Sequence, residues 1–262
     1  MLIIRTEQIA QLAADEVKRF NVRLQRHLLV SFPLQTAMAS EQSLGEFVDF
    51  AMTQAAAVGI DTEATVQSFA DHMVLLGADF HRNPLYADIA APLFDQDLVS
   101  PIQRLDLVYD RAWSYLDATR GPDAANLIRA MARLRATLGT PKEGWSVTTD
   151  DLIQTLHRIF PEKCGAHSVS TLTRFCGGTL ARAWEDGFEQ PPARVLYVCV
   201  AFLAGLGFFR DPLVLGGALH YAQALAAERD PARRTKLLGR GVALYLDTML
   251  AKVRGASLLI EE

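Results

Sequence analysis

Apolar residues recur along most of this chain at spacings of three and four, the period of an amphipathic helix, and no stretch alternates at every second position. The first long run, over residues 9–28, predicts one helix that ends before Pro33, because a proline disfavours helical angles in the residue before it. A second helix is expected to begin at Ser43, with Glu46 three residues on, and to end at Gly59. The pattern therefore predicts an all-α protein without a sheet.

Later helices are marked by polar caps, glycines and prolines. A third helix is expected between a cap at Asp61 or Thr62 and a glycine end at Gly77. Pro84 and Pro101 are expected to open further helices, as proline often does in a first helical turn. Together these signals predict roughly ten helices.

The chain resembles itself when position 75 is aligned with position 203 and the alignment is extended in both directions without a gap. The segment LLGADFHRNP at 75–84 then falls on LAGLGFFRDP at 203–212, and each is expected to end a helix at a glycine and begin the next at a proline. Between 31 and 84, 12 of 54 positions are identical in this alignment, where chance would give roughly 3 or 4. The matches are mainly prolines, glycines and apolar positions, which a duplicated helical unit should retain.

This duplication predicts two tandem pseudo-repeat helical bundles. The first unit would span residues 1–120 and the second 146–262, with a connecting helix and loop over 121–145. The connecting helix is expected over 124–138, and the flexible joint over 139–146.

Composition narrows the class of protein. Half of the 262 residues are hydrophobic, and the net charge of −4 argues against nucleic acid binding, which depends on clustered Lys and Arg. The longest uncharged apolar stretch, 195–209, is too short to span a bilayer and predicts a buried core helix, so no membrane association is expected. The charged N-terminus does not resemble a signal peptide, and Cys164, Cys176 and Cys199 are scattered, so we expect reduced thiols in a cytoplasm.

A zinc site could be imagined from Cys164, His167, Cys176 and Cys199, but this spacing matches no standard metal site. Cys176 aligns with Val48 of the first unit, which indicates a small core residue. We therefore expect neither a metal nor another cofactor.

A helical enzyme with a site near Asp71, His72, Asp79 and His81 is the catalytic alternative, because such histidines and carboxylates could act as general bases. In the second unit the four aligned positions hold a cysteine, a valine, a glycine and a phenylalanine, so a duplicated active site is excluded. We expect both histidines on the exposed side of the third helix and of the turn that follows it.

Two further features receive structural interpretations. Arg82 and Arg210 recur in both units; either could contact an anion, but a bond to helix-end carbonyls or to the adjacent Asn or Asp is favoured.

Gly177 and Gly178 fit no phosphate-loop pattern and predict a close helix crossing. The Ser/Thr cluster over 168–173 is expected to contain a helix cap.

Acidic residues are the candidate partner-binding positions, since a basic protein partner would meet them first. They are Asp88, Asp95 and Asp97 in the first unit and Glu185, Asp186 and Glu189 in the second.

The first 115 or so residues resemble a helical family associated with bacterial type VI secretion gene clusters. The resemblance rests on IRTEQIAQLA at Ile4–Ala13, H-L-x-x-x-F-P at His27–Pro33, V-G-I-x-x-E at Val58–Glu63 and L-G-x-x-F at Leu76–Phe80. Such proteins sit beside secreted effectors, so the resemblance implies an immunity or accessory protein and supplies no catalytic residues. The second unit lacks the IRTEQ motif.

We therefore expect a non-catalytic cytoplasmic protein, monomeric or homodimeric, that binds a cognate antibacterial toxin and occludes its active site. Binding of this kind needs only a complementary surface with a few aromatic or charged anchors. An effector adaptor or chaperone is the alternative in the same class. The helical enzyme above and a scaffold that only dimerises are the alternatives in other classes.

Overall fold

The computed structural model describes residues 6–95, 97–98, 100–138, 147–214, 224–225 and 227–258, with side chains from residue 14 to residue 253 of these ranges. Within them the chain forms eleven α-helices and no strand, so the all-α prediction is confirmed. The joint expected over 139–146 lies outside the described residues. None of the described helices combines the length and the apolar character that crossing a bilayer would need.

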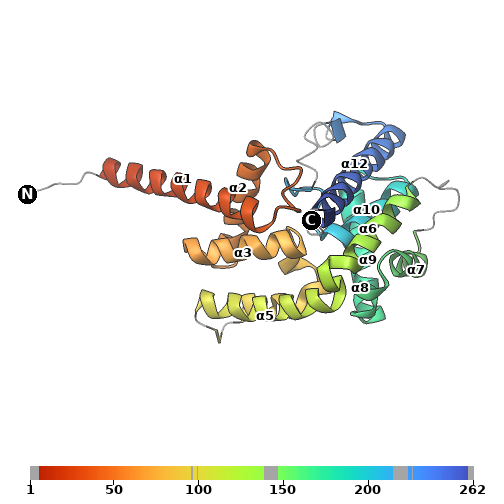
Figure 1. Cartoon of the computed structure of the whole chain (residues 1–262), viewed down its shortest axis with the longest axis horizontal. Coiled ribbons are helices and arrows are strands. Elements are labelled where there is room, and N and C mark those ends of the chain that lie inside the picture. Colours follow the sequence, from red (N-terminus) through yellow and green to blue (C-terminus); the bar gives the residue numbers. More distant parts are fainter. Residues whose placement is uncertain are drawn as a thin grey trace, which may run out of the picture.

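The helices fall into two groups joined by α6 (Figure 1). The first group is α1 (Thr6–Ser31), α2 (Glu41–Ala57), α3 (Glu63–Leu76), η1 (Phe80–Arg82), η2 (Pro84–Tyr86), α4 (Ala87–Ala90), η3 (Ala91–Phe94) and α5 (Pro101–Arg120). The connection is η4 (Pro122–Ala124) and α6 (Ala125–Thr137), and the second group is α7 (Thr149–Ile159), α8 (Pro161–Gly165), α9 (Val169–Glu185), α10 (Pro191–Ala204) and α12 (Pro231–Leu258). We call residues up to 120 the first half and residues from 147 the second half.

The alignment that relates the two sequences also relates the helix bounds. When position 75 is set on position 203, α2 begins and ends where α9 does, and α3 begins and ends where α10 does. The ends of α1 and α7 coincide as well, while the prolines that begin α5 and α12 differ by a shift of two positions. We call two residues that this alignment pairs equivalent positions.

Equivalent serines cap the second helix of each half. The Ser40 side chain accepts a hydrogen bond from the backbone N–H of Ser43, and the Ser168 side chain accepts one from Thr171. The expected start at Ser43 is therefore wrong by three residues, because Ser43 is inside the helix and completes a capping box with Ser40. The expectation of a cap in the 168–173 cluster is confirmed at Ser168.

The two halves meet at the glycines that end α3 and α10. Gly77 and Gly205 both have φ of 101°, and a Cβ atom on either would lie 2.5 Å from the Cα of the other. Just beyond this contact, the backbone N–H of Asp79 donates to the carbonyl of Leu206 at 3.0 Å. The two helix ends can approach so closely only because neither glycine carries a side chain.

Each joint continues in the same way after its glycine. Asn83 and Asp211, at equivalent positions, are both buried, and each accepts a hydrogen bond from the backbone N–H two residues on, at 3.0 and 2.9 Å. The core includes α10, where every residue from Val195 to Leu203 is buried. The predicted buried core helix over 195–209 is confirmed up to Ala204, where α10 ends.

The expected close helix crossing at Gly177 and Gly178 is wrong. Both glycines lie on the exposed side of α9, and a Cβ atom on either would find nothing within 4 Å. Their neighbours Cys176 and Thr179 form the buried side of this turn, so the helix packs through its side chains and not through its glycines.

Candidate functional site

Helix α5 forms one edge of the molecule (Figure 1). Several of its large apolar side chains are exposed to solvent. Its inner side packs against α3, α4 and η3 through buried Leu105, Val108, Ala112 and Leu116. On the outer side Ile102, Tyr109 and Trp113 are 57, 52 and 61 % exposed. Their spacing of seven and four residues places the three side chains above one another on a single side of the helix.

Carboxylates lie between these apolar residues. Asp106, Asp110 and Asp117 are exposed and fall on the same side of α5. The rings of Tyr109 and Trp113 are stacked, with centroids 6.1 Å apart and planes 16° from parallel. We call Ile102, Asp106, Tyr109, Asp110, Trp113 and Asp117 together the acid–aromatic face.

The arginines of α5 do not balance this negative charge at the surface. Arg104 donates to the carbonyl of Leu93 at 3.1 Å, and Arg111 donates to the carbonyl of Asp88 at 2.5 Å. Both guanidinium groups therefore fix η3 and α4 against α5, and the carboxylates of the acid–aromatic face form no ion pair among the described residues.

The six acidic residues expected to bind a partner separate into two places. Asp88, Asp95 and Asp97 are exposed on α4 and in the loop after η3, which are the segments packed against α5. Glu185 and Glu189 are exposed near the end of α9, in the other half. Neither group of acidic residues is thus shown to belong to the acid–aromatic face, because α4 and η3 pack against the inner side of α5 and Glu185 and Glu189 lie in the other half.

Asp186 differs from its acidic neighbours because its side chain is only 11 % exposed. It accepts hydrogen bonds from the Tyr197 hydroxyl at 2.7 Å and from Arg210 at 3.3 Å, while its backbone carbonyl accepts one from Arg234 at 2.7 Å. These bonds tie the end of α9 to α10 and α12, which is a structural role.

Arg82 and Arg210 line one hollow of about 180 Å³ between the halves. The favoured bond to helix-end carbonyls or to the adjacent Asn or Asp is wrong for Arg210, whose side chain pairs with the Asp186 carboxylate at the end of α9. A third arginine in the hollow, Arg182, donates to Asp79 across the halves at 2.7 Å. The hollow is therefore held mainly by ion pairs between segments distant in sequence.

The two candidate catalytic histidines are buried, so the expectation that they face solvent is wrong. His72 and His81 are 2 and 7 % exposed, and their equivalent positions hold Val200 and Phe209. His72 Nδ1 donates to the backbone carbonyl of Ser68 at 2.7 Å, and both ring nitrogens of His81 have no hydrogen-bond partner among the described residues. Burial lowers the pKa of both imidazoles.

The candidate catalytic carboxylates bind other groups. Asp71 lies 2.9 Å from His27 Nε2, on α1, and Asp79 pairs with Arg182 in the other half. Neither carboxylate forms a hydrogen bond with His72 or His81. The four residues thus have separate local partners instead of forming one acid–base constellation.

The cysteines are buried free thiols, and burial raises the pKa of each to about 12. Nearby, His167 Nε2 lies 3.0 Å from the Tyr115 hydroxyl, and burial followed by the charge of Lys163 lowers the pKa of this imidazole to about 4. Among the described residues no three His, Cys, Asp or Glu side chains are grouped so that they could hold a metal ion.

The acid–aromatic face was not anticipated from the sequence, although its signal is present there. Apolar residues at 102, 109 and 113 form a second apolar row on α5, next to its buried stripe. Comparison with protein-family models, with curated proteins and with solved structures finds no match to this chain.

Proposed function

We propose that this protein is a non-catalytic binding protein whose acid–aromatic face docks onto a basic surface of another protein. The observation that carries the proposal is the exposed, stacked pair Tyr109 and Trp113 set among three carboxylates that form no ion pair with any described residue. Aromatic side chains with few rotatable bonds supply much of the energy of protein interfaces, and surrounding charges steer the encounter and select the partner.

The partner that the sequence resemblance favours is a secreted antibacterial toxin made by the same strain, which this protein would neutralise by covering its active site. A toxin that acts on an anionic substrate such as nucleic acid or membrane phosphate has a basic active site. The carboxylates of the acid–aromatic face would complement such a site.

Co-purification with the toxin encoded next to this gene, followed by titration, tests the surface. Trp113→Ala should weaken binding by at least tenfold, because truncating a central aromatic anchor removes about 2 kcal/mol or more. Trp184→Ala is the matched control, since Trp184 is 57 % exposed on α9 in the other half. Equal loss in both variants, or in neither, would contradict the assignment of this face.

The carboxylates should act mainly on the association rate. Asp106→Asn together with Asp110→Asn should slow association and reduce its dependence on salt, while changing the dissociation rate less. Stopped-flow mixing at two ionic strengths measures this, and an unchanged salt dependence would show that these charges do not face the partner.

Survival of cells that express the toxin separates immunity from the alternatives. Cells should grow when this protein is co-produced and die when the Trp113→Ala variant replaces it. If cells die equally with and without the protein while the complex still forms, an effector adaptor or chaperone fits and immunity does not.

A further inference from the structure

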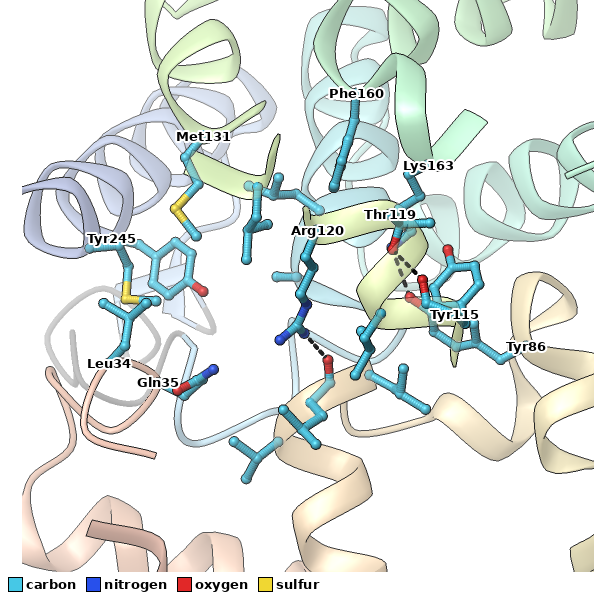
Figure 2. A pocket seen from close by; sticks show the side chains of 18 residues that line it. Leu34, Gln35, Tyr86, Tyr115, Thr119, Arg120, Met131, Phe160, Lys163 and Tyr245 are labelled. Carbon is cyan, nitrogen blue, oxygen red and sulfur yellow. Dashed lines mark hydrogen bonds between the residues drawn. The ribbon is translucent and has the colours of Figure 1, made fainter. Parts of the chain in front are cut away.

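A small polar cavity of about 60 Å³ lies where α3 and α10 end, and both halves line it (Figure 2). Gln35 and Lys163, at equivalent positions, contribute to its wall, and so do Tyr115 and Tyr245 from α5 and α12. The cavity is thus built at the centre of the repeat and is separate from the acid–aromatic face.

Two cationic side chains reach this cavity from the protein interior. Lys163 is 5 % exposed, and its Nζ donates to the Tyr86 hydroxyl at 2.7 Å and to the carbonyl of Phe202 at 2.6 Å. Arg120 donates from one Nη to the carbonyl of Leu75, and burial lowers the pKa of its guanidinium. No carboxylate is found among the described residues that line the cavity.

The two carbonyls belong to the last turns of α10 and α3, where helix carbonyls lack partners within the helix. Each helix C-terminus carries about half a negative charge, so the two ends together offset roughly one of the two positive charges. About one positive charge remains unbalanced in a buried place, which is costly unless an anion joins it.

Several hydrogen-bond donors at the cavity are unused. Arg120 engages one of its N–H groups, and no other bond to its guanidinium is found among the described residues. The Tyr245 hydroxyl and the Gln35 amide point toward this guanidinium across the open space in Figure 2, and neither bonds to any described residue. Arg120 on α5, Tyr245 on α12 and Gln35 in the turn after α1 thus direct hydrogen-bond donors at the same part of the cavity.

We propose that this cavity binds a small carboxylate monoanion. Its two oxygens would accept hydrogen bonds from the Arg120 guanidinium, and one of them would also accept from the Tyr245 hydroxyl or the Gln35 amide. The planar guanidinium matches a carboxylate through two parallel hydrogen bonds. The remaining wall is apolar and includes Met131 and Met249, which suits a short aliphatic body. A single negative charge matches the charge excess, and the volume admits only a few non-hydrogen atoms.

Thermal unfolding of the full chain with added sodium butyrate tests the site, with sodium chloride and sodium phosphate at the same ionic strength as comparisons. Butyrate should raise Tm by roughly 5 °C at a hundredfold excess over its Kd. Isothermal titration with butyrate should show one site, weakened at least a hundredfold by Arg120→Met and about fivefold by Tyr245→Phe. Arg111→Met is the matched control, because Arg111 lies on the same helix and donates to a carbonyl but is exposed.

If Arg120→Met does not fold, Tyr245→Phe and Gln35→Leu still decide the matter, since each removes one donor and keeps the charge. The proposal fails if butyrate stabilises the wild type no more than chloride does. It also fails if phosphate stabilises it as strongly as butyrate, or if Tyr245→Phe and Gln35→Leu bind butyrate as the wild type does.

Discussion

Replacing Gly205 by alanine should strongly destabilise the protein, because this glycine forms the contact between its halves. Its backbone, with φ of 101° and ψ of 155°, is in a region that residues with a side chain avoid. A Cβ atom would also meet two backbone atoms of the first half at 2.5 Å, the Cα of Gly77 and the carbonyl oxygen of Leu76.

Two costs contribute to the expected loss. Holding alanine in this backbone conformation costs about 1–3 kcal/mol. Relieving the overlap requires the ends of α3 and α10 to separate, and overpacking of this kind costs about 1–3 kcal/mol. The sum, about 4 kcal/mol, is a large part of the roughly 5–15 kcal/mol that stabilises a typical folded protein.

Urea unfolding followed by far-ultraviolet circular dichroism measures this loss against a control from the same protein. Gly177→Ala adds the same methyl group on the exposed side of α9, where nothing lies within 4 Å. Because alanine favours a helix over glycine, that variant should gain up to about 1 kcal/mol. If Gly205→Ala lost less than about 1 kcal/mol, the close contact between α3 and α10 would be refuted.

Three further changes have defined outcomes. Burial raises the pKa of Asp211 to about 7, so the stability that its protonated form provides is fully present below about pH 4 and is lost as the pH rises through 7. The variant Asp211→Asn, which copies Asn83, should therefore gain up to about 4 kcal/mol at pH 8 and little at pH 4 in urea unfolding. His81→Leu should gain about 1–2 kcal/mol at pH 7, because it removes two unpartnered buried nitrogens. The gain should be larger at pH 5, because the lowered pKa of His81 costs stability as the pH falls. An equal gain at both pH values would contradict the burial of His81. Ser168→Ala should lose about 1 kcal/mol in thermal unfolding through loss of the cap on α9, whereas an unchanged Tm would exclude that role.

Helix bounds were the part of the fold most accessible from sequence, because prolines, glycines and caps act locally. Pro101 begins α5, and Thr62 caps α3 as one of two expected residues. The error at Ser43 arose because Ser43 and Glu46 imitate a capping box, while Ser40 and Ser43 form the real one. Two overlapping local signals compete here, and the packing of α2 selects between them.

Burial of polar residues was the part least accessible. His72 and His81 were expected at the surface from their chemistry, yet the repeat pairs them with Val200 and Phe209, which are apolar or aromatic. An apolar or aromatic residue at the equivalent position is a signal for burial, and this signal places both histidines in the core. Arg120 offers no such signal, because its burial depends on where α5 meets the end of α3.

The exposure of the acid–aromatic face could not be predicted from the sequence for a different reason. A helix with apolar residues on two sides does not reveal which side enters the core. Val108 and Tyr109 are neighbours in the chain, yet Val108 is fully buried and Tyr109 is half exposed. The positions of α3, α4 and η3 against α5 decide between them.

The carbonyls at the ends of α3 and α10 also bear on the order in which the protein folds. Arg120 and the carbonyl of Leu75 are 45 residues apart within the first half, and Lys163 and the carbonyl of Phe202 are 39 apart within the second. The Arg182–Asp79 pair between the halves spans 103 residues. Because short loops close at a lower entropic cost, each half can form the hydrogen bond to its own helix-end carbonyl before the halves dock, and docking then brings together two surfaces whose helix ends already have partners.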